Sequence, residues 1–422
     1  MSPFTVGESL TLEITSVVFP GIGLARHQGA VVFVPGVMAG ETVTAVVRKA
    51  AARHAHATPA TLTQAHPSRI IPTCPLALHP DPDGSFPSRP VCPGCAYAHM
   101  PYAEELAIKS SQFANLFDHT LHIDRNGEIP AFPAPSPLGY RNKITLHARR
   151  TGQALTLGYI GTDNSTVLDV PACPLAAEAI NRTLSELRTT PGALDHLNDQ
   201  AELVLRHTSF NGVLHWIKRQ TLPVPTLTET TPLGPIQVPT DAFFQVNPPV
   251  AGELVDQVRR MVHEQAPERL IDAYGGIGLF GLACARDGIP SVHILESNEP
   301  SVIAARLNAR TLKLAGVHAH IGTVERTLAG LLKGVAEHTT VIIDPPRTGL
   351  SAHVRASLVR LHPRHLVYVS CAPDTLARDL RDLFTGGYRF RSTRWFDMFP
   401  RTPHFETVTE LEWTPSGAAP QT

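Results

Sequence analysis

The sequence predicts a multidomain α/β protein: a β-barrel, then a mixed α+β region, then a doubly wound parallel sheet. Length is the first observation, since 422 residues correspond to about three domains at roughly 150 residues each. Proline clusters at 72–101, 130–137 and 223–249 are the second, because such clusters mark boundaries between folded units. The third is a change of pattern near residue 240, from short alternating strands to strands that alternate with helices.

Residues 1–63 are predicted to form a small OB-type β-barrel. Alternating residues at Ser9–Thr15, Ala30–Pro35 and Glu41–Val47 indicate strands, and glycines supply the turns between them. The order of Gly21-Ile-Gly23, then Val-Val-Phe-Val-Pro-Gly and Gly-Glu, resembles the TRAM domain, a barrel appended to RNA-modifying enzymes. That resemblance implies RNA binding, and the alternative is a small barrel without this role.

The central α+β domain is predicted at 64–240, and a Rossmann-like domain at 241–415. In the latter, short apolar runs separated by helical stretches indicate parallel strands whose carboxyl ends form the ligand site. These runs are Leu270–Tyr274, Val292–Glu296, Val341–Asp344 and Leu366–Ser370. The strand-like Glu406–Trp413 is expected to add an antiparallel edge, and 416–422 to form a tail.

The composition of the chain limits the classes of function that it could have. Charged residues make up 17% of the chain and the net charge is -1, so RNA binding would depend on local patches. No apolar run approaches the roughly 18 residues of a membrane span, and the N-terminus lacks a basic segment before an apolar stretch. We therefore expect a cytoplasmic protein without a membrane partner. Six cysteines in such a chain are more often metal ligands or catalysts than disulfides.

A glycine-rich turn indicates a nucleotide-type ligand. Asp272-Ala-Tyr-Gly-Gly-Ile-Gly278 follows a predicted strand and opens a helix, where glycines let the backbone approach a ligand closely. Glu296 ends the next strand, where a carboxylate can hold ribose hydroxyls. On these features alone the ligand is NAD or S-adenosylmethionine, and a turn without a ligand is the alternative.

Asp344-Pro-Pro-Arg347 ends another predicted strand. Methyltransferases that modify an exocyclic amine usually carry an aromatic fourth residue in this motif, which stacks on the flipped base. Arg347 therefore argues against that chemistry. A plain strand-end aspartate before a rigid turn is the alternative.

A cysteine and a glutamate complete a reaction logic. Cys371 follows a strand, and Pro373 suits the first position of a helix, whose N-terminus favours a thiolate. Carbon 5 of uracil is too weak a nucleophile to take a methyl group directly, but thiolate addition at C6 activates it. A carboxylate such as that of Glu406 can then remove the C5 proton. Considered one at a time, each residue has an alternative interpretation. Cys371 could be an ordinary buried cysteine, and Glu406 an ordinary surface carboxylate.

These motifs together resemble the RNA 5-methyluridine (uracil-C5) methyltransferase family over nearly the whole chain, in the branch with a TRAM domain and an iron–sulfur cluster that acts on 23S rRNA. The resemblance rests on five segments: Phe243–Asn247, Asp272–Gly278, Asp344–Arg347, Val369–Asp379 and Asp397–Glu406. It implies that Cys371 is the nucleophile and Glu406 the proton acceptor. It also implies an S-adenosylmethionine site lined by Gln245, Tyr274, Glu296 and Asp344.

Four cysteines are candidate metal ligands. The two-residue spacing of Cys92 and Cys95 lets two thiolates bind one centre, and Cys74 and Cys173 complete a set of four. On spacing alone zinc and a 4Fe-4S cluster are equal alternatives. The resemblance implies the 4Fe-4S cluster, with zinc as the runner-up and a structural or RNA-positioning role.

The expected function is S-adenosylmethionine-dependent methylation of uridine C5 in structured RNA by a monomeric enzyme. Its partner is expected to be 23S rRNA, with tRNA as the alternative. Cytosine C5 methylation, an inactive RNA-binding or assembly factor and a dehydrogenase are the competing readings. Gly139-Tyr-Arg-Asn-Lys143 is a basic-aromatic stretch that either contacts RNA phosphates or is a solvated loop.

Overall fold

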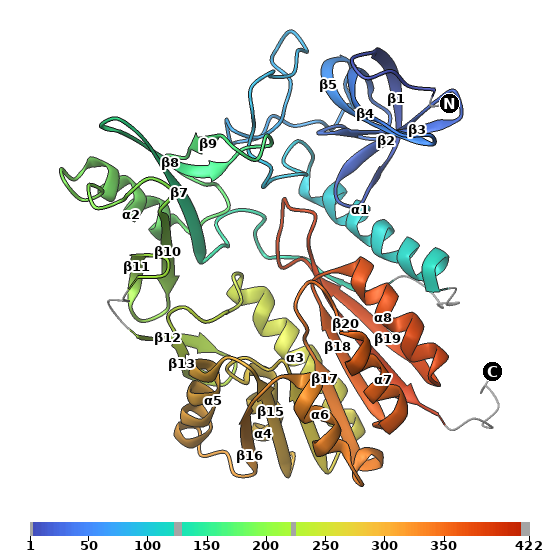
Figure 1. Cartoon of the computed structure of the whole chain (residues 1–422), viewed down its shortest axis with the longest axis vertical. Coiled ribbons are helices and arrows are strands. Elements are labelled where there is room, and N and C mark those ends of the chain that lie inside the picture. Colours follow the sequence, from blue (N-terminus) through green and yellow to red (C-terminus); the bar gives the residue numbers. More distant parts are fainter. Residues whose placement is uncertain (1–2, 122–128, 221–224, 415–422) are drawn as a thin grey trace.

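Three bodies follow one another along the chain in Figure 1: a barrel, a mixed region and a large sheet covered by helices. The computed structural model describes residues 3–121, 129–220 and 225–414, so the predicted tail at 416–422 lies outside the described residues. None of the helices in these ranges combines the length and hydropathy that a bilayer crossing requires.

The N-terminal strands close into a barrel, drawn in dark blue in Figure 1. They are β1 (Ser9–Val18), β2 (Ile22–His27), β3 (Ala30–Pro35), β4 (Thr42–Ala50) and β5 (His54–Gln64). The hydrogen-bonded order is β1-β2-β3-β5-β4. Alternate residues point inward, so Val32, Val34, Val43 and Val47 are buried in one core. The predicted barrel is confirmed.

The central region contains a mixed layer of antiparallel strands and one helix. Its elements are β7 (Lys143–Thr151), β8 (Ala154–Ile160), β9 (Val167–Asp169), α2 (Glu178–Thr189), β10 (Glu202–Thr208) and β11 (Gly212–Ile217). The sheet order is β11-β10-β7-β8-β9. Ile180 and Leu184, one helical turn apart, bury the apolar face of α2 against this sheet.

A two-stranded ribbon leads from the central region into the C-terminal domain. It is formed by β12 (Thr226–Thr231) and β13 (Gly234–Pro239). The Gln237 amide donates a hydrogen bond of 2.8 Å to Asn308 Oδ1, and Asn308 Nδ2 donates one of 2.9 Å to the Gln237 carbonyl. This reciprocal pair fixes the ribbon to the C-terminal domain.

The C-terminal domain is a twisted sheet with helices packed against it (Figure 1). Its strands are β14 (Arg269–Ala273), β15 (Ser291–Glu296), β16 (Val317–Ile321), β17 (Thr339–Ile343), β18 (His365–Ser370), β19 (Tyr388–Phe396) and β20 (Glu406–Trp413). Its helices are α3 (Pro248–Gln265), α4 (Leu279–Arg286), α5 (Glu299–Thr311), α6 (Val324–Leu332), α7 (Ala352–Leu361) and α8 (Pro373–Thr385). The predicted Rossmann-like arrangement of parallel strands is confirmed for β14 to β18.

The last strand differs from its prediction. The sheet order is β16-β15-β14-β17-β18-β20-β19-β6, so β20 lies between two strands and is not the edge. Its first six residues are buried, which an edge strand facing solvent would not require. β19 precedes β20 in the chain but lies outside it in the sheet, and the loop 397–405 brings β20 back beside β18.

Residues 102–121 and 129–132, predicted within the central domain, pack largely on the C-terminal one. They include α1 (Tyr102–Asn115) and β6 (Ala131–Phe132), which pairs with β19 in parallel. Phe113 is fully buried and makes edge-to-face contacts with Phe117 and Phe405 at 5.1 and 5.5 Å between ring centroids. Aromatic packing therefore holds this early segment against the end of the chain.

Candidate active site

The register of the C-terminal sheet brings the predicted nucleophile and base together. β18 and β20 are antiparallel, with Ser370 opposite Thr407. Cys371 follows Ser370 and Glu406 precedes Thr407, so the two residues are neighbours at one end of the paired strands. This is the carboxyl end of the parallel strands, where a doubly wound sheet binds its ligands.

The glycine-rich turn lies at the end of β14 and is held from two sides. The Gly276 amide donates to Glu296 Oε2 at 3.1 Å, and the Gly281 amide donates to Asp272 Oδ2 at 2.8 Å. Gly276 and Gly278 have φ of 55° and 81°, the left-handed region that suits glycine. The predicted turn between strand and helix is therefore formed.

The two left-handed glycines face different surroundings. A Cβ on Gly278 would lie 2.5 Å from Ile294 Cδ1, so this residue lets the turn pack on β15. A Cβ on Gly276 would meet no heavy atom within 4 Å. The backbone at Gly276 thus borders open space, as a surface for a ligand requires.

Tyr274, within this turn, and Gln245, in the segment before α3, have features that suit ligand binding. Tyr274 has a φ of 63°, which is strained for a bulky residue and is found at functional sites more often than elsewhere. Gln245 is buried, and among the described residues no group donates a hydrogen bond to its Oε1. A buried amide oxygen without a partner is costly, so a bound molecule is a natural donor.

Asp272 is a buried carboxylate that the sequence analysis did not include among the site residues. Burial, together with the negative charge of Glu296, raises its pKa to about 7. Asp272 Oδ1 has no hydrogen-bond partner in the described part of the chain, while Oδ2 holds the helix that follows the turn. Its place as the first residue of the glycine motif was the available signal.

Asp344 ends β17 and is close enough to Asp272, Cys371 and Glu406 to interact with them electrostatically. Burial and the charge of Asp272 raise the pKa of Asp344 to about 7. Acidic groups therefore line this end of the sheet. A cationic ligand would relieve their mutual repulsion.

The surroundings of Cys371 oppose the thiolate that the helix N-terminus favours. Burial and the charge of Glu406 raise the pKa of the Cys371 thiol to about 12, although the positive charge of Arg347 lowers it. Burial and Asp344 likewise raise the pKa of Glu406 well above its usual value. Desolvation is the largest cause of the raised pKa of Cys371.

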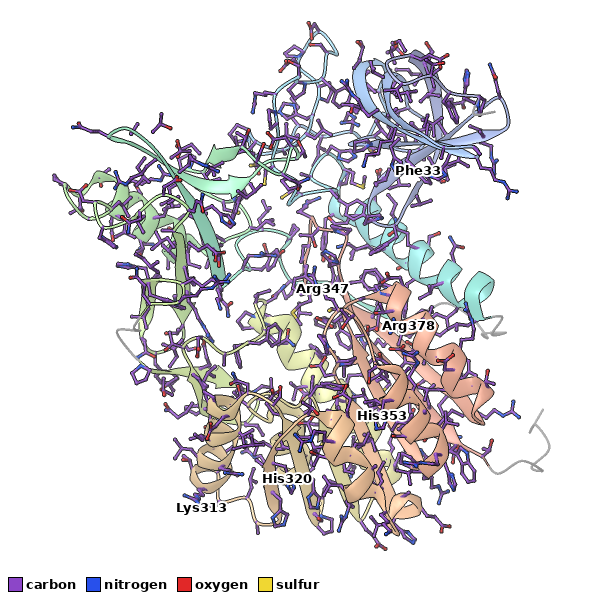
Figure 2. All side chains as sticks on the ribbon, in the orientation of Figure 1. Phe33, Lys313, His320, Arg347, His353 and Arg378 are labelled. Carbon is purple, nitrogen blue, oxygen red and sulfur yellow. The ribbon has the colours of Figure 1, made fainter. Side chains whose placement is uncertain are left out.

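Arg347 is the cation of this site, and the sequence analysis used it only to exclude another chemistry. Figure 2 places it at the end of the C-terminal sheet that faces the rest of the molecule. It lowers the pKa of both Cys371 and Glu406, and its Nη1 lies 3.5 Å from His404 Nε2. Its exposed side chain remains accessible to a substrate.

The stretch 139–143 is not a freely solvated loop, and whether it contacts RNA stays a prediction. Tyr140 and Asn142 are buried. The Tyr140 hydroxyl donates to the Pro400 carbonyl at 3.0 Å, and Asn142 Nδ2 donates to the Gln245 carbonyl at 3.1 Å. The stretch thus connects the central region to two segments of the candidate site.

The four predicted cysteine ligands are brought near one another. Cys92, Cys95 and Cys173 line a cavity of about 280 Å³, and Cys74 and Cys95 line a second one. Burial and the neighbouring cysteines raise the pKa of the Cys74, Cys92 and Cys95 thiols. In the described ranges, however, no three or more His, Cys, Asp or Glu residues are placed to hold a metal ion. A metal centre is thus not shown.

Comparisons with known proteins find matches to both the C-terminal and the N-terminal regions of the chain. A family model described as tRNA (Uracil-5-)-methyltransferase matches residues 236–413, and the TRAM domain model matches 3–60. The 23S rRNA (uracil(1939)-C(5))-methyltransferase RlmD of Pseudomonas putida is 29% identical over 96% of this chain and 94% of its own. RlmD of Aeromonas hydrophila is 26% identical over 93% of each chain.

A solved structure shares the fold. The Pyrococcus abyssi tRNA (uracil-54, C5)-methyltransferase in complex with S-adenosyl-L-homocysteine superimposes with a TM-score of 0.72. It is 23% identical, and the match covers 95% of this chain and all of that one. The uracil-5-methyltransferase match covers the glycine turn, Asp344, Cys371 and Glu406. The C-terminal domain therefore belongs to the family of RNA (uracil-C5)-methyltransferases, and a TRAM domain precedes it at the N-terminus.

Proposed function

We propose that this protein methylates uridine C5 in 23S rRNA, using S-adenosylmethionine and a covalent bond between Cys371 and the pyrimidine. The observation that carries the mechanism is the antiparallel register that sets Cys371 beside Glu406. The two RlmD relatives, which match over nearly their whole length, support 23S rRNA as the substrate. Cytoplasmic location and a monomeric state stay predictions from the sequence.

The residues at the glycine turn fit the proposed methyl donor. Glu296 offers a half-buried carboxylate to ribose hydroxyls, and the open backbone at Gly276 allows close approach. Gln245 Oε1 is an acceptor in need of a donor, and the acidic carboxyl of Asp344 suits a sulfonium cation. When bound, the donor supplies an electrophilic methyl group.

The proposed chemistry begins when the Cys371 thiol releases its proton to solvent. The Cys371 thiolate adds to C6 of the uracil ring, and the electron pair of the C5–C6 bond moves toward C5 and the C4 carbonyl. Carbon 5 then forms a bond to the methyl carbon as the sulfur–methyl bond breaks. Arg347, the cation next to Cys371, stabilises the negative charge that the thiolate carries at the start of this sequence.

The glutamate acts after methyl transfer. Carbon 5 now carries both a methyl group and a hydrogen, and the carboxylate of Glu406 accepts that proton. The electron pair left on C5 restores the C5–C6 double bond and expels the Cys371 thiolate. The products are 5-methyluridine, demethylated donor and a protonated Glu406, whose raised pKa suits a group that must hold a proton.

We further propose that Cys74, Cys92, Cys95 and Cys173 hold a 4Fe-4S cluster, for which four thiolates are the ordinary ligand set. Three of them line one cavity, and the resemblance of the chain to iron–sulfur members of the family favours a cluster over zinc. The cluster has no electron to supply to methyl transfer. Its proposed role is to hold the segment after Cys95 in place.

RNA with 5-fluorouridine at the target position tests the mechanism. Fluorine at C5 cannot leave as a proton, so a methylated covalent complex of protein and RNA should persist on a denaturing gel. Cys371→Ala should form none. Absence of the complex with the unaltered protein, or its presence with Cys371→Ala, would contradict the covalent route.

The choice between ribosomal and transfer RNA needs a separate measurement. A tRNA substrate is the second candidate, because the fold matches that of the Pyrococcus abyssi tRNA enzyme. Mapping 5-methyluridine in 23S rRNA and tRNA from a strain lacking the gene should show its loss in 23S rRNA only. Loss confined to tRNA would overturn the substrate assignment and leave the chemistry intact.

A further inference from the structure

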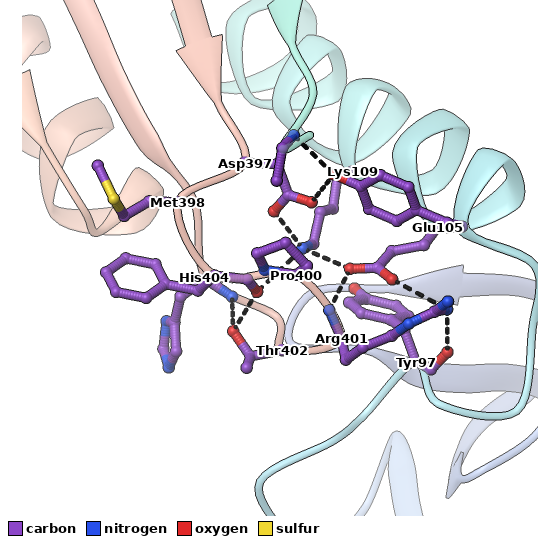
Figure 3. Close-up of polar contacts among 12 residues, drawn as sticks. Tyr97, Glu105, Lys109, Asp397, Met398, Pro400, Arg401, Thr402 and His404 are labelled. Carbon is purple, nitrogen blue, oxygen red and sulfur yellow. Dashed lines mark hydrogen bonds and ion pairs between the residues drawn. The ribbon is translucent and has the colours of Figure 1, made fainter. Parts of the chain in front are cut away.

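A buried network of charges lies behind the active site, and Figure 3 shows its contacts. Glu105 and Lys109 are one turn apart on α1, so their side chains meet on the same face. Lys109 Nζ lies 2.7 Å from Glu105 Oε1 and 2.7 Å from Asp397 Oδ1. All three side chains have no exposed surface. They cannot contact a substrate in this arrangement.

The network holds the loop 397–405 at two residues, Asp397 and Arg401. Asp397 is its first residue and also accepts a hydrogen bond of 2.7 Å from the Tyr102 hydroxyl. The Arg401 amide donates to Glu105 Oε1 at 2.7 Å, and Arg401 Nη1 donates to the Met100 carbonyl at 2.8 Å. Arg401 Nη1 also lies 3.4 Å from Glu105 Oε2, so two acidic and two basic groups balance.

The loop is held in a conformation that it would not adopt alone. Arg401 has a φ of 67°, a left-handed conformation that costs a non-glycine residue free energy. Two further hydrogen bonds hold the loop backbone. The Tyr140 hydroxyl donates to the Pro400 carbonyl, and Asn247 Nδ2 donates to the Met398 carbonyl at 3.3 Å. The segment that contains Asn247 is itself held by the bond from Asn142 to the Gln245 carbonyl. The surrounding contacts therefore determine the path of the chain into β20.

Stability alone is a poor explanation for this arrangement. Buried ion pairs seldom stabilise a fold more than apolar residues of the same size would, because each charge must lose its water. What distinguishes this network is its position. The loop that it holds ends at Phe405, and the next residue is Glu406, the first residue of β20.

We propose that Glu105, Lys109, Asp397 and Arg401 form a positioning device that fixes the loop 397–405 and so directs the Glu406 carboxylate at C5 of the target uracil. The inference rests on the proposed function, in which Glu406 removes the C5 proton. Because that step comes last, a loosened loop should leave thiol addition and methyl transfer intact. The reaction should then stall at the methylated covalent complex.

The test uses Asp397→Asn and Lys109→Met in the full-length protein. Each removes one charge while keeping a side chain of similar size. Tyr102→Phe is a milder third variant, which loses only the hydroxyl that contacts Asp397 and the Ala134 amide. Glu41→Gln is the matched control, since Glu41 is fully buried and paired with Arg69, and neither residue belongs to the network around Lys109.

The assay follows the two halves of the reaction in a single turnover. The RNA carries tritium at C5 of the target uridine, and S-adenosylmethionine carries a ¹⁴C methyl group. Tritium in water reports proton removal, and ¹⁴C on denatured protein reports the methylated adduct. A base displaced by about 1 Å can lose about 10²-fold in rate, so tritium release should slow by about 10- to 100-fold.

We expect Asp397→Asn and Lys109→Met to accumulate the ¹⁴C adduct on ordinary uridine RNA, with adduct formation within about twofold of the unaltered protein. Tyr102→Phe should slow release about threefold, and Glu41→Gln should show no accumulation. The double variant Lys109→Met/Asp397→Asn restores charge balance, so its unfolding temperature should recover while slow tritium release persists. Equal slowing of both readouts, or unchanged tritium release, would overturn the positioning role.

Glu406→Gln separates a failure of the positioning device from a failure of the proposed chemistry. It should accumulate the methylated adduct more strongly than any network variant. If it does and the network variants do not, the positioning device is wrong and the proposed chemistry stands. If Glu406→Gln itself accumulates no adduct, the role of Glu406 in the proposed function is what fails.

Discussion

Cys371 lies among groups that oppose its ionisation. Burial and Glu406 raise the pKa of this thiol to about 12, and the Arg347 guanidinium is the neighbouring charge that acts in the other direction. A raised pKa lowers the fraction of this thiol that is ionised at neutral pH. It also makes the first step depend on how much thiolate is present.

This state of the thiol predicts a pH dependence. Below its pKa the thiolate fraction rises about tenfold per pH unit, so adduct formation with 5-fluorouridine RNA should accelerate steadily from about pH 6 to pH 9. Rapid quenching on a denaturing gel measures that rate. A rate that is flat across this range would mean that Cys371 is already ionised in the complex.

Arg347→Met should slow adduct formation by at least about tenfold at pH 7, because it removes the charge that lowers the pKa of Cys371. Arg360→Met is the control, since Arg360 is an exposed arginine on α7 and the change in net charge is the same. Raising the pH should partly rescue Arg347→Met. Equal rates for the two variants would remove Arg347 from the mechanism.

Among the elements, the turn between β14 and α4 separates packing from ligand binding. Gly278→Ala combines left-handed strain with a contact of 2.5 Å to Ile294, so it should lower the free energy of unfolding by about 2–4 kcal/mol. Gly276→Ala meets open space and should cost only about 1–2 kcal/mol, from strain. Gly276→Ala should instead weaken S-adenosylmethionine binding more. Chemical denaturation and calorimetric titration measure the two effects, and equal profiles would contradict this assignment.

Local elements were predictable from sequence to the extent that their determinants are local. Strand-end motifs such as Asp344-Pro-Pro-Arg347 identified the active end of the sheet, because alternating strands and helices leave few possible topologies. The interior position of β20 and the pairing of β6 with β19 were not predictable. They depend on packing between residues far apart in the chain, which the periodicity of hydrophobic residues does not indicate.

The same distinction holds for the candidate site. Cys371 and Glu406 could be named because the chemistry of uracil C5 requires those side chains. The charge of Arg347 on the thiol, the orphaned oxygen of Asp272 and the Lys109 network could not. Their roles arise from burial and from contacts that only the assembled fold creates.

At the scale of the whole molecule, the segment that follows Cys95 contacts the loop before Glu406. Tyr97 lies two residues after Cys95, and its amide donates to the Arg401 carbonyl at 3.2 Å. Gln112 of α1 donates to the Val17 carbonyl of the barrel at 3.1 Å. Hydrogen bonds therefore join the barrel to α1, and the segment after Cys95 to the loop before Glu406.

Protein purified without oxygen should contain about four iron and four sulfide per chain, with broad visible absorption, if the cluster is present. Cys95→Ala should lose most of both, because it removes a thiolate that faces the shared cavity. Cys284→Ala is the control, since Cys284 is buried in α4 within the apolar core. Zinc without iron, or iron unaffected by Cys95→Ala, would contradict the cluster.

The pairing of β6 with β19 has a consequence for how the chain matures on the ribosome. β6 ends at Phe132 and β19 begins at Tyr388, so translation at about 5–20 residues per second delays the match by on the order of tens of seconds. Throughout that interval the aromatic face of α1 lacks its eventual cover. Nascent chains released before their final strands emerge should thus be clients for chaperones, and none of them can carry a working fragment of the enzyme.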